Sequence, residues 1–191
     1  SILQQTWSDF ELIVVDDGST DESRQIAASF DDTRIRLLSN ARNMGLAYSL
    51  NAALAAARGP LVARQDADDL SHPDRLAVQL DLLGQAGARC AFVGCHCALV
   101  DREGRVFGRV EPPGSAKELS QTLGRGYSPV PHGSVVFRRE AVAEAGGYDE
   151  RFWFAQDFDL WLRLLQRGWD FDVVPRILYE YRMLPERRTF K

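Results

Sequence analysis

The sequence has little cysteine and little histidine, with three residues of each among its 191, and its net charge is only −4. It also lacks an uninterrupted apolar run of about 18 residues, the length that a membrane-spanning helix needs. The slight acidity argues against non-specific nucleic-acid binding, which requires a basic face. What is present, 45% hydrophobic and 26% charged residues, is typical of a soluble globular domain and excludes a disordered chain or a disulfide scaffold.

The few cysteines cluster in one short stretch, at Cys90, Cys95 and Cys97. Their odd number in an ordinary composition indicates a reducing compartment, so we expect a cytoplasmic protein. Cys95 and Cys97 are too close for a structural zinc site, in which about two to four residues separate paired ligands. Because Cys90–Val100 is typical of a buried strand, we expect core cysteines rather than metal ligands.

Apolar runs alternate with helical patterns through the first half of the chain. Such alternation predicts an α/β protein with a mainly parallel sheet flanked by helices. A chain of this length is predicted to form a single domain, and the start at Ser1, with no leader after it, is expected to be a fragment edge. The predicted strands are Glu11–Val15, Arg34–Ser39 and Leu61–Gln65, and the helices are Ser19–Phe30, Met44–Arg58 and a segment beginning near Pro73.

The second half is less regular but still mixes both patterns. Gln156–Gln166 is strongly amphipathic, with Phe158, Trp161, Leu162 and Leu165 on one face. The other predicted helices are Ala116–Leu123 and Glu140–Ala145, and the predicted strands are Cys90–Val100, Val106–Val110, Ser134–Arg138, Phe171–Val174 and Ile177–Tyr181.

Acidic clusters follow two of the predicted strands, and in such sheets ligands bind beyond the carboxyl ends of the strands. Asp17, in Asp16-Asp17-Gly18-Ser19, is placed to accept hydrogen bonds from a base or ribose, although these are also ordinary turn residues. Asp66, Asp68 and Asp69 would repel one another without a cation. A divalent Mg²⁺ or Mn²⁺ shared with a diphosphate suits them; a helix-entry turn is the alternative.

Three further segments carry candidate site residues. Asp157, after Gln156, lies at the start of the amphipathic helix and is a candidate general base, which the helix dipole should keep ionised. The alternative is that Asp157 is an ordinary acidic residue at a helix start, where the dipole favours a negative charge. Trp153 in the aromatic run 152–154 is a candidate for acceptor binding. His132 is a candidate for acceptor or phosphate binding or a structural residue, and Arg42 and Asn43 precede a helix where they could contact a phosphate.

Several segments in order along the chain form a known pattern: Ser1–Trp7, Asp9–Asp21, Asn43–Ala47, Asp66-Ala67-Asp68, Phe137–Arg139, Gly146–Glu150, Gln156–Trp161 and Tyr181-Arg182. Together they resemble the family 2 glycosyltransferases, which have the GT-A fold. The resemblance covers nearly the whole chain and implies transfer of a sugar from a nucleotide-sugar to an acceptor hydroxyl, with inversion and a divalent metal. It also implies a nucleotide-sugar-binding half, 1–100, and an acceptor-binding half, 101–191.

The resemblance assigns a role to each matching acid. Asp17 matches the acid that contacts the nucleotide base, Asp66 the acid near the ribose and diphosphate, Asp68 the metal-binding acid and Asp157 the catalytic base. A UDP-sugar donor and a saccharide or lipid-linked saccharide acceptor are implied, in cell-surface polysaccharide or glycolipid synthesis. Asp17, Asp68 and Asp157 are then expected to meet at one cleft.

Three departures from the family pattern leave alternatives open. The apolar strand with which family members begin is not seen, Gln156 replaces a Glu, and Leu184 replaces a His. A sugar-1-phosphate nucleotidyltransferase, or a degenerate nucleotide-binding module without activity, therefore stay as alternatives. The basic tail Arg176–Lys191 is expected to be solvated, with contact to the cytoplasmic face of a membrane as the minor alternative.

Overall fold

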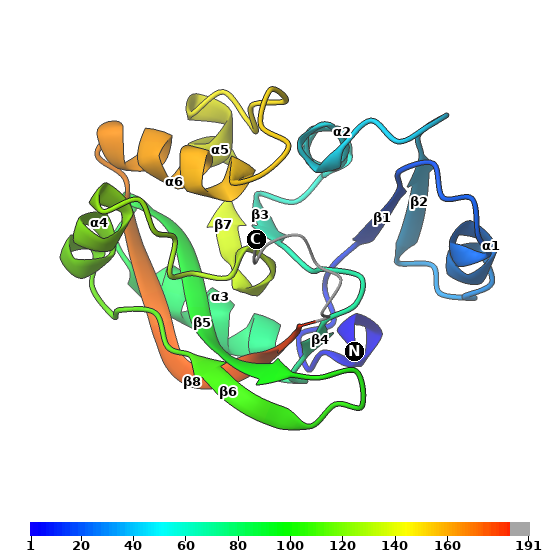
Figure 1. The fold of residues 1–191 in the computed structure, drawn as a ribbon, viewed down its shortest axis with the longest axis horizontal. Helices are drawn as coiled ribbons and strands as arrows, with labels where there is room; N and C mark the ends of the chain where they lie inside the picture. The colour runs from blue at the N-terminus through cyan, green and yellow to red at the C-terminus, as the bar shows by residue number, and fades with distance from the viewer. Residues whose placement is uncertain (184–191) are drawn as a thin grey trace.

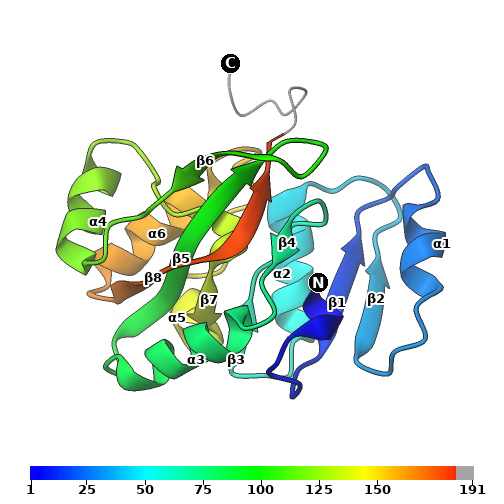
Figure 2. The same cartoon turned by 90° about the horizontal axis from the view of Figure 1, so that it is seen from below.

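The computed structural model describes residues 1–183, which form two sheets with helices packed around them (Figures 1 and 2). The smaller sheet pairs β1 (Leu12–Asp16) with β2 (Ile35–Ser39) in parallel. Parallel neighbours need a crossover, which α1 (Ser23–Ala28) supplies, and α2 (Leu46–Ala56) packs against β1. This part of the fold confirms the predicted alternation of strands and helices.

The larger sheet is mixed, which corrects the expectation of a mainly parallel sheet. In this larger sheet, as the structure describes it over residues 1–183, only β5 and β8 pair in parallel, and the other neighbours are antiparallel. The alternation ends after α3 (Arg75–Gln85), because the short turn at 101–105 has no room for a crossover and forces an antiparallel return. The strand order is β3 (Leu61–Ala63), β7 (Val136–Arg138), β5 (Cys90–Val100), β8 (Asp170–Arg182) and β4 (Leu70–Ser71), with β6 (Val106–Val110) on β5.

The hydrophobic core lies in two layers, one on each face of this sheet. On one face Phe92 packs between Trp161 and Phe171, with ring centroids 4.2 and 4.3 Å apart. On the other face the buried side chains come from α3 and from β5, β7 and β8. The helices over the first face are α4 (Ala116–Gly124), α5 (Arg139–Glu144) and α6 (Gln156–Gln166).

The cysteines confirm their predicted place, since Cys90, Cys95 and Cys97 are free and buried in β5. The predicted helix start at Ser19, by contrast, is wrong. The Ser19 amide donates to Asp16 Oδ1 at 3.0 Å, which closes a turn, and α1 begins only at Ser23. Two short 3-10 turns, η1 (Ile2–Gln4) and η2 (His132–Ser134), complete the described elements.

No helix within residues 1–183 has the length and apolar character needed to cross a bilayer.

Replacing Phe92 by alanine is expected to lower the free energy of unfolding by about 3–5 kcal/mol, because it empties the space between two aromatic rings in a fully buried site. Urea denaturation measures the effect. Phe107→Ala is the matched control: its side chain is 59% exposed, so the change should stay within about 0.5 kcal/mol. Equal effects of the two substitutions would contradict this description of the core.

Candidate active site

The acidic loop, residues 66–69, follows the end of β3, and its last acid points inward. The Asp69 side chain is 4% exposed and accepts hydrogen bonds from Tyr179 Oη at 2.8 Å and from the Arg182 amide at 2.7 Å. Burial raises the pKa of the Asp69 carboxyl to about 6, although these two hydrogen bonds oppose the change. Asp69 is therefore an internal acceptor that ties the loop to β8.

The other two acids of the loop are half-buried. Asp66 pairs through Oδ1 with Nη1 of Arg64, a residue that is only 7% exposed. The Asp66 amide donates to Tyr179 Oη at 3.2 Å, and the Asp68 carbonyl accepts from Arg182 Nε at 2.9 Å. The backbone that carries Asp66 and Asp68 is thus bound to its surroundings, while their side chains lie nearer the surface than Asp69.

A buried arginine supports the loop from below. Arg75 of α3 is fully buried, and its Nη1 donates to Gln65 Oε1 at 3.1 Å and to Ser71 Oγ at 2.8 Å. Gln65 in turn donates from Nε2 to the carbonyls at both ends of the acidic loop, 3.0 and 2.9 Å away. Sequence reasoning missed this support; the signal was an arginine on the apolar face of a helix that follows an acidic cluster.

Asp17 lies at the amino end of α2 and is occupied by internal hydrogen bonds. Its carboxylate accepts from Asn40 Nδ2 at 2.7 Å and from the amides of Met44 and Gly45 at 2.8 and 2.9 Å. Burial acts to raise the pKa of Asp17, but these hydrogen bonds outweigh it and hold the pKa below its ordinary value. The side chain thus orders the segment that contains Arg42 and Asn43, both exposed.

Asp157 is the second residue of α6. This helix begins at Gln156, directly after Ala155, whose φ of 56° is left-handed. Burial raises the pKa of its carboxyl; the Phe158 amide and the charge of Arg64 oppose this. Desolvation therefore acts against the helix dipole, and the expectation that the dipole keeps this carboxylate ionised at neutral pH stays a prediction. Asp66 also raises the pKa of Asp157, which places the acidic loop and the start of α6 within electrostatic reach of each other.

The aromatic run before α6 contacts the Asp17 segment. A Cβ built on Gly45 would lie 3.6 Å from Cζ3 of Trp153, a side chain that is 70% exposed. Since the Gly45 amide binds Asp17, Trp153 links the start of α2 with the start of α6. The meeting of Asp17, Asp68 and Asp157 at one cleft stays a prediction.

His132 lies in η2, beneath this region. Its Nε2 is 2.8 Å from Tyr148 Oη, and its ring meets the Trp161 ring edge-on at 5.9 Å. Burial, helped by the charge of Arg64, lowers the pKa of His132 well below the ordinary value, so the ring is neutral. The geometry suits a structural histidine, and its predicted role in acceptor binding stays a prediction.

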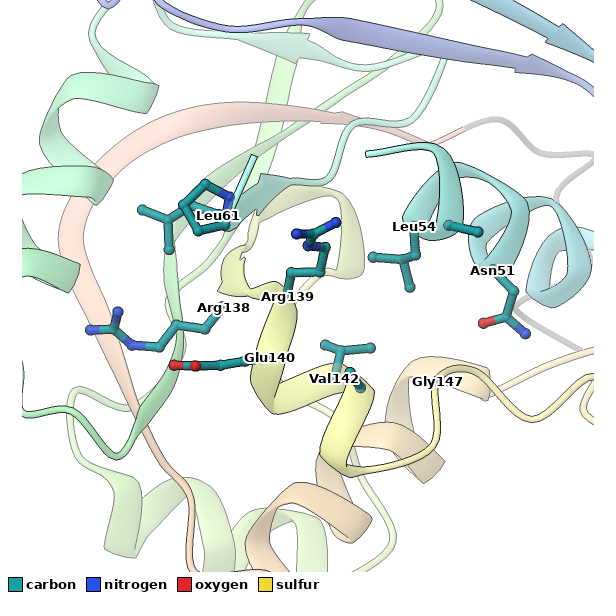
Figure 3. A pocket seen from close by; sticks show the side chains of 11 residues that line it. Asn51, Leu54, Leu61, Arg138, Arg139, Glu140, Val142 and Gly147 are labelled. Carbon is teal, nitrogen blue, oxygen red and sulfur yellow. The ribbon is translucent and has the colours of Figure 1, made fainter. Parts of the chain in front are cut away.

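Among the residues that the structure describes, no group of three or more His, Cys, Asp or Glu side chains is arranged so that it could hold a metal ion. Leu184, at the third departure from the family pattern, lies outside those residues. An open pocket of about 640 Å³ between α2, β3 and α5 is not part of the candidate site (Figure 3). Pro60 and Leu61, at the start of β3, line it, whereas the acidic loop follows the end of that strand.

A family model described as glycosyl transferase family 2 matches residues 1–146, and the chain belongs to that family. The putative glycosyltransferase EpsE of Bacillus subtilis is 36% identical over 95% of this chain and 66% of its own length. The amylovoran biosynthesis glycosyltransferase AmsE of Erwinia amylovora is 30% identical over 95% of this chain and 68% of its own. The chain thus spans about two thirds of the length of these curated relatives.

Two solved structures have the same fold. S. aureus TarS, in complex with UDP, has a TM-score of 0.72 at 18% identity and covers 96% of this chain with 55% of its own. The mannosyltransferase PcManGT of Pyrobaculum calidifontis, in complex with GDP-Man and Mn²⁺, has a TM-score of 0.70 at 25% identity, with coverages of 98% and 52%. Both are GT-A proteins, so the predicted GT-A fold is confirmed.

Replacing Gly133 by alanine is expected to destabilise the protein by about 1–3 kcal/mol. A Cβ at this position would overlap the Tyr179 hydroxyl and would lie 3.1 Å from Asp66 Oδ2, so it would push apart the contacts of the acidic loop. Thermal denaturation measures the loss. Gly84→Ala is the control, because nothing lies within 4 Å of a Cβ there and alanine favours the helix. A neutral Gly133→Ala would show that the packing around Tyr179 is looser than described.

Proposed function

We propose that the chain transfers a sugar, with inversion, from a nucleoside diphosphate donor, with UDP as the nucleotide, to a hydroxyl of a saccharide or lipid-linked saccharide. The observation that carries the proposal is the acidic loop after β3, in which Asp66 pairs with the buried Arg64, whose charge also acts on the half-buried Asp157 at the start of α6. The names of EpsE and AmsE support a role in polysaccharide synthesis, and the UDP and GDP-Man complexes support a nucleotide-sugar donor.

On the donor side, Asp17 and Asp66 are proposed to contact the nucleotide. Because Asp17 already accepts three hydrogen bonds, its contribution includes ordering the segment before α2. That segment presents Arg42 and Asn43 at a helix amino end, where cationic groups and free amides favour a phosphate. We propose that these two residues contact the diphosphate.

The donor set of the loop fits a divalent ion. Mg²⁺ and Mn²⁺ prefer oxygen ligands, and in nucleotide sites one or two carboxylates are usually completed by phosphate oxygens and water. Asp68 would hold the ion together with the donor, so the protein need not supply a full set of ligands. When bound, the ion would neutralise charge on the departing diphosphate.

On the acceptor side, Asp157 is proposed as the general base. Its carboxylate would take the proton of the acceptor hydroxyl while that oxygen bonds to the anomeric carbon and the bond to the diphosphate breaks. A raised pKa makes the carboxylate a stronger base, provided that it is ionised at the working pH. Trp153, which is largely exposed just before this helix start, would pack against an acceptor sugar. His132 is proposed as a further residue of the acceptor site. The reaction is proposed to take place in the cytoplasm or at the cytoplasmic face of a membrane.

Mn²⁺ is expected to strengthen UDP binding, and Asp68→Ala is expected to remove that gain, because the metal then loses its protein ligand. Calorimetric titration of UDP in Mn²⁺ and in EDTA measures both affinities, and GDP serves as the competing nucleotide. Asp81→Ala, in α3, is the control acid. Equal UDP affinities of the unaltered chain in Mn²⁺ and EDTA would overturn the metal assignment.

Asp157→Asn is expected to lower turnover at least 100-fold, the usual order for a general base, while UDP affinity stays within about twofold. Since burial favours the protonated form of Asp157 in the folded state, the neutral Asn should not destabilise the protein at pH 7. For the same reason turnover of the unaltered enzyme should fall on acidification with a midpoint above about 3.9, the ordinary pKa of aspartate.

The control for this substitution is Asp159→Asn, which removes an acid of the same helix that pairs with Arg163 instead. Turnover is measured as sugar transfer from a UDP-sugar. A drop of less than tenfold in Asp157→Asn would reduce Asp157 to a helix-start residue. Donor binding without any transfer would favour the inactive binding module, and formation of a nucleotide-sugar from a sugar phosphate would favour the nucleotidyltransferase.

A further inference from the structure

The backbone of the acidic loop is fastened to β8 by two side chains with no assigned role, Tyr179 and Arg182. Both belong to the half of the chain that the sequence assigns to acceptor binding. Neither contact involves the carboxylates of Asp66 or Asp68, the groups proposed to meet the donor.

Arg182 joins three segments through one planar group. Its Nε donates to the Asp68 carbonyl at 2.9 Å, and its Nη1 donates to the carbonyls of Asp101 and Arg102 at 2.9 and 2.8 Å. Its own amide donates to Asp69 Oδ1. Because the guanidinium is rigid and its donors diverge, it fixes the distance between the loop and the β5–β6 turn; a lysine ammonium cannot hold both sides in the same way.

Tyr179 makes a similar attachment to the first and last residues of the acidic loop. Its hydroxyl donates to Asp69 Oδ2 at 2.8 Å and accepts from the Asp66 amide at 3.2 Å. The side chain is 1% exposed, and its ring lies against the guanidinium of Arg75, 4.9 Å from ring centroid to Cζ. The positions of Asp66 and Asp69 are thus set through a single buried oxygen.

We propose that Arg182 and Tyr179 are positioning residues that hold the acidic loop in the one backbone arrangement in which Asp66 and Asp68 can take a metal-bound nucleoside diphosphate. The inference rests on the proposed function. A site that takes only one or two ligands from the protein depends on where these are held. Loosening the loop should therefore weaken metal-dependent nucleotide binding before it weakens the fold.

The test uses Arg182→Lys and Tyr179→Phe, with UDP as the probe in Mn²⁺ and in EDTA. Arg182→Lys keeps the charge but loses the divergent donors, and Tyr179→Phe removes one hydroxyl and no charge. Each is expected to weaken UDP binding in Mn²⁺ by about three- to tenfold, the order expected for lost hydrogen bonds. Binding in EDTA should change less than twofold, and melting temperatures should stay within a few degrees of the unaltered protein.

The matched control is Arg105→Met, which removes an exposed arginine of the same turn that pairs with Asp101 and Glu103 and makes no contact with the loop. If Arg182→Lys binds UDP like the unaltered protein, Arg182 acts by charge alone and the inference is wrong. It is also wrong if Tyr179→Phe has no effect, or if affinities in Mn²⁺ and EDTA fall together. An unaltered chain that binds neither UDP nor GDP in Mn²⁺ contradicts the proposed function itself.

Discussion

The Arg75 guanidinium is the constraint on which the site depends. It is fully buried and forms no ion pair with a carboxylate of residues 1–183, and burial lowers its pKa, as expected for a desolvated cation. Its charge is tolerated because every donor meets a neutral acceptor: besides Gln65 and Ser71, these are Gln79 Oε1 and the carbonyls of Arg64 and Val135, all within 3.2 Å. An unmet donor at this depth would be costly. These hydrogen bonds therefore hold α3 in a fixed position relative to the end of β3 and the start of β7. The position of the acidic loop depends on that arrangement.

The acidic loop is held by contacts that cross between the two halves of the chain. The acids proposed for donor binding lie within 1–100, yet the groups that fix them, Tyr179 and Arg182, come from β8. The long parallel pairing of β5 with β8 positions Tyr179 and Arg182 beside the loop. The division into donor and acceptor halves therefore describes only which ligand each half would contact. The structure of the donor half depends on a strand of the acceptor half.

Patterns that depend on neighbouring residues could be predicted from the sequence, and contacts across the fold could not. Period-two and helical spacing located most elements, and the acidic cluster after an apolar run located the loop. The same cluster could not tell that Asp69 turns inward, because that depends on Tyr179, more than a hundred residues away. Nor could the position of Asp157 at a helix start tell that burial raises its pKa. The prediction of a mainly parallel sheet failed at strands such as β5 and β6, which the short turn at 101–105 joins in place of a crossover helix.

Arg64 differs from Arg75 in a way that bears on chemistry. Both are buried, but within residues 1–183 the Nε of Arg64 has no hydrogen-bond partner, and its Nη1 has only the ion pair with Asp66. One cation therefore faces two acids, Asp66 and Asp157, and cannot neutralise both. The uncompensated charge, added to burial, is why the pKa of Asp157 is raised despite a nearby arginine. A fully neutralised carboxylate would be a weak base, and an unpaired buried one would stay protonated. Sharing one arginine between two acids would therefore suit the general-base role that we propose for Asp157.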